Sequence, residues 1–92
     1  MNILKGIITV IGCDQVGIIA KVCGFLSDNG INILDISQSI IQGYFNMLMI
    51  VDLTGFDGRF EELSENLTEL GERIGVLIKL QHTDIFNSMH RI

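Results

Sequence analysis

The chain of 92 residues contains no proline, and its two cysteines are Cys13 and Cys23. Without proline-rich or low-complexity stretches, no linker divides the chain, and one domain spanning residues 1–92 is expected. The cysteines match neither a C-x-x-C pair nor a repeated metal-ligand spacing, so we expect no disulfide framework and no metal site. No uncharged apolar run reaches eighteen residues, and no signal peptide is recognisable, so a membrane partner is not expected. These absences predict a reduced, cytoplasmic protein.

Basic residues are also scarce. Six Lys and Arg stand against eleven Asp and Glu, which gives a formal net charge of −5 at pH 7. A surface that follows a phosphate backbone needs a cluster of positive charge, and the sequence has none. Nucleic acid is therefore not expected as a direct partner.

Apolar residues, in contrast, are abundant for so short a chain. They make up 48% of the sequence, and the mean hydropathy is +0.46. A chain of this size buries only roughly 60–65% of its unfolded surface. Either the core is simply rich in isoleucine, or a second apolar surface is covered by another copy. The mismatch between size and apolar content favours a homodimer or a higher homo-oligomer.

The spacing of apolar residues predicts six elements in one order. Strands are expected at residues 4–11, 31–40, 44–53 and 76–80, and helices at residues 16–29 and 60–74, with Asp57 as N-cap of the second helix. Residues 84–92 are expected to form a short helical tail. The order strand, helix, strand, strand, helix, strand is that of the ferredoxin-like α+β fold. In that fold a four-stranded antiparallel sheet carries two helices on one face.

Catalytic residues in a recognisable arrangement are not found. His82 and His90 lie in the last eleven residues, without a nearby nucleophile or a metalloprotease motif. The glutamates of the second helix alternate with its apolar stripe: Glu61, Glu62, Glu65, Glu69 and Glu72. A solvated acidic face explains them. We therefore expect a protein that is not an enzyme and that needs no cofactor.

The junction between the first strand and the first helix, Gly12–Gly17, has the composition of a binding site. The first N–H groups of a helix lack internal partners and favour a carboxylate or another small anion. Asp14 is suited to accept a hydrogen bond from an ammonium group, so the turn offers both charges that an α-amino acid needs. Two alternatives stay open: Asp14 as the helix N-cap and Gly17 as a packing residue. For Cys13, packing or ligand contact is expected rather than redox chemistry.

Two motifs in this order resemble the ACT domain: D-x-x-G at Asp14–Gly17 and G-x-N-I at Gly30–Ile33. The likeness extends to the small stand-alone bacterial and archaeal members, which are related to the ACT modules of glycine-cleavage repressors. It implies a regulatory domain that holds an amino acid or a similar small ligand between two subunits. One subunit would supply the first turn, and its neighbour the residues after the first helix. The implied ligand-binding residues are Gly12, Cys13, Asp14, Gln15, Val16, Gly17, Ile18, Asn32 and Ile33.

The resemblance also bears on how such a domain would act. Family members usually regulate an attached catalytic or DNA-binding domain, and none is found within these 92 residues. Regulation would therefore act in trans, on a separate enzyme or regulator, or through the assembly of the chain itself. The alternative is a protein-interaction module that keeps the ACT scaffold without a ligand. Its functional surface would be the apolar sheet face and the tail.

Overall fold

The structure is a computed structural model, and it describes residues 4–13, 17–56 and 58–82. Its elements are β1 (Lys5–Gly12), α1 (Ile18–Asp28), β2 (Asn32–Ile41), β3 (Tyr44–Asp52), α2 (Phe60–Ile74) and β4 (Leu77–His82). The predicted ferredoxin-like fold is confirmed, and the strand boundaries shift by one or two residues. The tail predicted at residues 84–92 lies outside the described residues.

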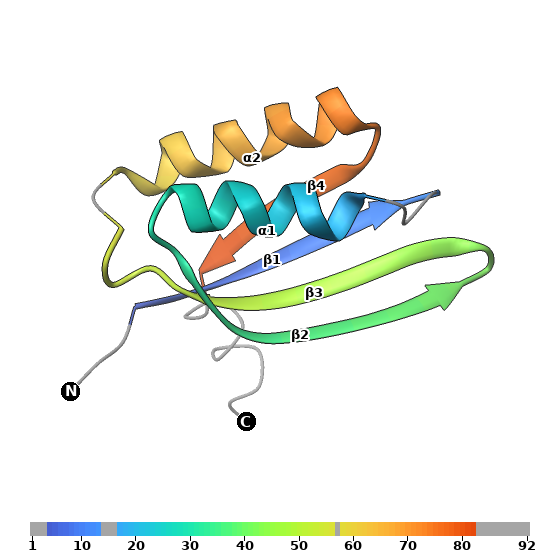
Figure 1. The fold of residues 1–92 in the computed structure, drawn as a ribbon, viewed down its shortest axis with the longest axis horizontal. Helices are drawn as coiled ribbons and strands as arrows, with labels where there is room; N and C mark the ends of the chain where they lie inside the picture. The colour runs from blue at the N-terminus through green and yellow to red at the C-terminus, as the bar shows by residue number, and fades with distance from the viewer. Residues whose placement is uncertain (1–3, 14–16, 57, 83–92) are drawn as a thin grey trace.

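The four strands form one sheet in the order β2-β3-β1-β4, and every neighbouring pair is antiparallel. Both helices lie on the same face of this sheet, so the described residues form two layers (Figure 1). Since β1 and β3 occupy the centre, β2 and β4 are the two edges. We call the face opposite the helices the open face.

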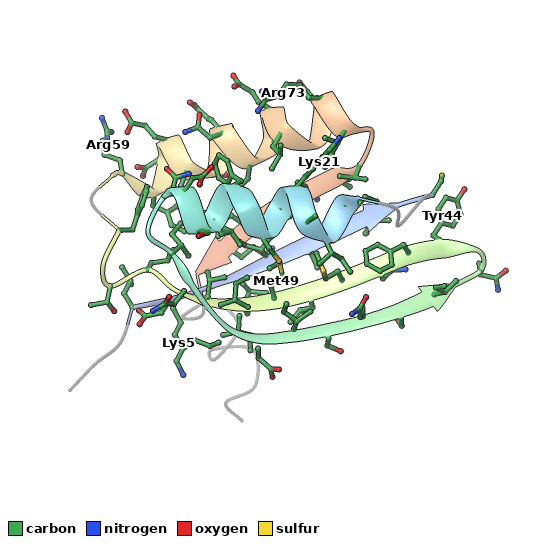
Figure 2. All side chains as sticks on the ribbon, in the orientation of Figure 1. Lys5, Lys21, Tyr44, Met49, Arg59 and Arg73 are labelled. Atoms are coloured by element: carbon green, nitrogen blue, oxygen red, sulfur yellow. The ribbon has the colours of Figure 1, made fainter. Side chains whose placement is uncertain are left out.

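The hydrophobic core lies between the helices and the two central strands. Side chains alternate across a strand, so Ile8 and Val10 of β1 point to the same face as their partners Met49 and Met47 on β3. Figure 2 shows Met49 between the sheet and α1. The helices complete the core with residues at helical spacing: Ile18, Val22, Leu26, Leu63, Leu67 and Leu70. Burying one such side chain stabilises the fold by about 1.5–3 kcal/mol.

The edge strand β2 is exposed on both of its faces. Of its ten residues, only Ile33 is half-buried. Ile36 and Ile40 lie on the helix side, opposite Met49 and Phe45, but Ile40 is still 63% exposed. The reason is that the helices cover the centre of the sheet and leave this edge bare. An irregularity between Ile33 and Asp35 interrupts the pairing with β3, as a β-bulge does at an edge.

The predicted cap of the second helix is wrong. The N-cap of α2 is Arg59, and the helix begins at Phe60, so position 57 lies two residues before the cap. Phe60 packs against the core, and this contact sets the first turn of the helix. At the other end Gly75 closes α2 in the left-handed conformation, with φ at 80°, as the sequence predicts.

Gly71 allows α2 to approach β4 closely. A Cβ atom at this position would lie 2.6 Å from the carbonyl oxygen of Val76 and 3.1 Å from Cγ1 of Ile78. The first contact is with backbone, which yields less readily than a flexible side chain. The helix therefore keeps a residue that is unfavourable in helices because the strand beside it leaves no room for a larger one.

Gly71→Ala should lower the free energy of unfolding by about 1–3 kcal/mol, because the added methyl group forces α2 away from β4. The control is Gly24→Ala in α1, where a Cβ atom meets nothing within 4 Å. There the better helix former should raise the free energy of unfolding by about 0.5–1 kcal/mol. Urea unfolding followed by circular dichroism measures both. Equal effects of the two substitutions would contradict the packing role of Gly71.

Candidate functional site

The turn predicted as a binding site joins β1 to α1 at one end of the sheet. Gly12 is the last residue of β1, and α1 begins at Ile18. Cys13 carries an exposed thiol. The residues between Cys13 and Gly17, which are Asp14, Gln15 and Val16, lie outside the described residues. For these three the ligand contacts stay a prediction.

The residue at the N-cap position of α1 makes no side-chain hydrogen bond to the helix. Gly17 is the N-cap residue, with φ at 78°, and α1 has no acidic residue in its first turn. Because Gly17 holds the cap position, Asp14 is not the N-cap residue. A side chain at position 17 would have space, since a Cβ atom there meets nothing within 4 Å, but its positive φ favours glycine. Gly17 has no side chain that could accept from the first N–H groups of α1, and such groups favour an anion.

Gly12 has a packing role in the structure. A Cβ atom at this position would lie 2.5 Å from Cγ1 of Val76 and 3.4 Å from Cδ1 of Ile18. The space beside Gly12 is therefore filled by the segment that joins α2 to β4. Ile18 itself is part of the hydrophobic core, with 4% of its surface exposed. A ligand at this turn would meet backbone atoms of these two residues rather than side chains.

A hollow of about 300 Å³ lies beside the turn. It is lined by Ile11, Gly12, Cys13, Tyr44, Gly71, Glu72, Gly75, Val76 and Leu77. Figure 2 shows Tyr44 near the end of β1. The sequence prediction missed Tyr44 and the residues around the C-terminus of α2. No local motif marks them, because strand pairing and the packing of α2 against β4 bring them to the turn from distant parts of the chain.

The second predicted part of the site, Asn32 and Ile33, lies at the opposite end of the sheet. Asn32 pairs with Asp52 on β3, whereas Gly12 pairs with Phe45. Phe45 and Asp52 are seven positions apart on β3, which is roughly 23 Å along a strand at about 3.3 Å per residue. The fold of one chain therefore does not bring the two parts together.

An ionised carboxylate lies next to Asn32. Asp52 accepts a hydrogen bond of 2.9 Å from the backbone N–H of Thr54. Hydrogen bonds from the side chain and the backbone of Thr54 lower the pKa of Asp52, and the positive charge of Lys5 lowers it further. Sequence reasoning missed Asp52, since its position opposite Asn32 follows from the register of β2 and β3. The arrangement places an amide and a carboxylate together at the start of β2.

The acidic face predicted for α2 is confirmed, because all five glutamates are exposed. Within residues 4–13, 17–56 and 58–82 there is no group of three or more His, Cys, Asp or Glu side chains that could hold a metal ion. No helix in this part of the chain is long and apolar enough to span a membrane. His82 ends β4, and His90 lies outside the described residues.

Known proteins match both the sequence and the fold. A family model described as the ACT domain matches residues 6–81. The UPF0237 protein of Bifidobacterium longum is 57% identical over 88 residues, which cover 96% of this chain and 98% of the relative. An ACT domain protein from Streptococcus pneumoniae has a similar structure, with a TM-score of 0.84 and 38% identity over 92% of this chain and 96% of that one.

A more distant likeness concerns the fold alone. A structure described as a glycine cleavage system transcriptional repressor superposes with a TM-score of 0.75 at 23% identity. The match covers 90% of this chain and 47% of the repressor. The same scaffold therefore occurs as part of a longer protein.

Removing the hydroxyl group of Thr54 should raise the pKa of Asp52. Thr54→Val removes the side-chain hydrogen bond that is the largest cause of the lowered pKa. A ¹³C NMR titration of the Asp52 carboxyl carbon measures the change. A carboxyl group with a lowered pKa in the folded state stabilises the fold above its unfolded pKa, and this stabilisation is lost in acid. The variant should therefore lose less stability than the wild type as the pH falls below about 4.

Thr68→Val is the matched control, because the Thr68 hydroxyl donates to the carbonyl oxygen of Ser64 within α2. It should leave the titration of Asp52 unchanged. If the pKa of Asp52 is the same in Thr54→Val as in the wild type, the Thr54 hydroxyl does not stabilise the ionised carboxylate of Asp52.

Proposed function

The chain belongs to the ACT domain family, and from this membership we propose that it is a regulatory homodimer that binds an amino acid between its subunits. One observation carries the proposal. The turn after Gly12 and the Asn32–Ile33 pair lie at opposite ends of one sheet. A ligand that uses both needs a second copy of the chain to complete its site.

Strand directions favour one arrangement of the two copies. Because β1 and β2 both run antiparallel to β3, they run parallel to each other and end at the same end of the sheet. If β2 pairs with the β2 of a second copy across a two-fold axis, the two strands run antiparallel. The start of the partner's β2 then lies at the end where this chain has its first turn. Asn32 of the partner subunit is thereby brought toward that turn.

The edge of β2 is suited to such a pairing. It is ten residues long, and four of its apolar side chains are exposed: Leu34, Ile36, Ile40 and Ile41. The other edge, β4, has six residues, and the exposed Lys79 lies on it. A lysine on an edge strand opposes pairing with another strand. The apolar content of this short chain predicts apolar surface that its own core cannot bury, and pairing through β2 would cover part of that surface.

The two parts of the site offer complementary groups for an amino acid. The N-terminus of α1 favours the ligand carboxylate, and Asp14 would accept a hydrogen bond from the ammonium group. An amide such as Asn32 of the partner subunit can bind either group. The exposed Cys13 and the half-buried Ile33 of the partner subunit would border the site and suit a small aliphatic side chain. The domain would act in trans, in the cytoplasm, on a separate enzyme or regulator.

A second candidate function rests on the open face. Ile11, Tyr44, Leu48 and Leu77 are exposed there, and exposed apolar patches often bind proteins. In that case the domain would be an interaction module without a ligand. Capture of one partner in stoichiometric amount, unchanged by added amino acids, would favour this function over sensing.

An amino acid that binds the dimer should raise its unfolding temperature. At a concentration 100 times its dissociation constant, the ligand adds about 2.7 kcal/mol of stability. A thermal-shift screen of the common amino acids, followed by calorimetric titration, identifies the ligand. Asp14→Ala and Asn32→Ala should each abolish binding while the protein stays folded. If no amino acid shifts the unfolding temperature, the sensing function is wrong.

Mixing the two variants tests whether the site is shared between subunits. In a heterodimer of Asp14→Ala with Asn32→Ala, one site contains both substitutions and the other contains none. After random exchange of subunits, about one quarter of the wild-type binding capacity should return. No recovery, although mass spectrometry shows heterodimers, would indicate that both residues serve a site within one chain.

Introducing a charge on β2 should separate the two copies. Ile40→Lys puts an ammonium group on the proposed interface, and sedimentation velocity should show a monomer with an unchanged circular dichroism spectrum. Leu77→Lys is the control, because this 51% exposed side chain lies on the opposite edge of the sheet. A dimer that survives Ile40→Lys but dissociates in Leu77→Lys would contradict pairing through β2.

A further inference from the structure

The hollow of about 300 Å³ beside the first turn has the size and the walls of a small-molecule site. It lies at the end of the sheet where β1 ends, β3 begins and α2 leads into β4 (Figure 1). Its volume is at the lower end of the range for ligand pockets. Two of its apolar residues, Ile11 and Leu77, are 40% and 51% exposed. The hollow therefore offers apolar surface to the alkyl part of one small molecule.

Tyr44 adds an aromatic ring to this hollow. The side chain is 50% exposed and lies near the end of β1 (Figure 2). The face of an aromatic ring attracts a cation through its quadrupole. A planar guanidinium group can also stack on such a ring. The ring therefore favours a positively charged ligand over an anion.

Glu72 brings a negative charge to the same hollow. Its side chain is exposed, and it makes no ion pair with any of the residues that the structure describes. Neighbours on a helix are three and four residues apart, and no lysine or arginine lies at these spacings from Glu72. Arg73 instead follows Glu69 by four residues, the spacing that suits an ion pair between those two. The carboxylate of Glu72 is therefore available to a cation in the hollow.

The C-terminus of α2 adds partial negative charge at this place. A helix carries such charge on the carbonyl oxygens of its last turn, and Gly75, which closes α2, lines the hollow. The N–H groups of Gly75 and Val76 both donate to the carbonyl oxygen of Gly71. They are therefore not donated to the last three carbonyl oxygens of the helix. Neither Arg73 nor Lys79 is among the residues that line the hollow.

We propose that this hollow binds a small organic cation of the alkylguanidinium class. The alkyl part lies against the apolar wall at Leu77, and the planar guanidinium group stacks on Tyr44 and donates hydrogen bonds to the carboxylate of Glu72. The site lies within one chain, so it needs no second copy. It shares only Gly12 and Cys13 with the proposed amino-acid site, and it does not depend on that proposal.

Titration of the full-length chain with n-butylguanidinium, followed by amide NMR spectra, tests this site. The probe should shift the amide signals of Cys13, Tyr44 and Val76, which line the hollow. The matched probe is n-butylurea, which has a similar shape and no charge. It should bind at least about fivefold more weakly, because it loses the charge-assisted hydrogen bonds to Glu72.

Two pairs of variants test the residues. Glu72→Gln should weaken binding of n-butylguanidinium about fivefold or more. Glu69→Gln removes the same charge from an exposed position of α2 outside the hollow and should leave the affinity unchanged. Tyr44→Leu should weaken binding about two- to fivefold, whereas Tyr44→Phe keeps the ring and should bind as the wild type does.

Three outcomes would overturn the proposal. The first is an absence of shifts at Tyr44 and Val76. The second is an equal affinity for n-butylguanidinium and n-butylurea, since charge would then play no part. The third is an equal loss of affinity in Glu69→Gln and Glu72→Gln, because the acidic face of α2 as a whole would then attract the probe. The probe has no carboxylate, so this titration and the amino-acid screen fail separately.

Discussion

The pairing of β1 with β3 at the centre of the sheet is the interaction on which the rest of the fold depends. It places Ile8 and Val10 beside Met49 and Met47 on one face, where both helices cover them almost completely. Once these two strands are central, the order of the chain leaves β2 and β4 as the edges. The same pairing also positions the first turn, because Gly12 lies opposite Phe45 at the end of the sheet.

A sheet covered on one face leaves two kinds of surface for function. Its edge β2 presents unpaired backbone groups and exposed apolar side chains, which fit a second strand. Its open face presents side chains only, so it fits a segment or partner that packs without adding a strand. The proposed function assigns the edge to a second copy, and the open face keeps the exposed side chains of Ile11, Tyr44, Leu48 and Leu77.

The glycines near the first turn show how far a local motif can be interpreted. The resemblance to the ACT domain implies that Gly12 is one of the ligand-binding residues. In the fold Val76 occupies the space beside it, so close packing alone is enough to require glycine there. Gly17 differs, since it has a positive φ and open surroundings at the N-cap position of α1. Of the two, only Gly17 has the open space beside it that an anion needs.

The sequence by itself determined the order of the elements, the apolar stripes of both helices and the turn that leads into α1. Each of these depends on residues close together in the chain, where periodicity and glycine chemistry act directly. The tertiary structure decided that Ile18 lies in the core, that Tyr44 and Cys13 line one hollow, and that Asp52 lies opposite Asn32. It also decided that Asn32 and Gly12 lie at opposite ends of the sheet. These relations depend on strand order and register, which arise from the packing of distant segments and leave no local pattern in the sequence.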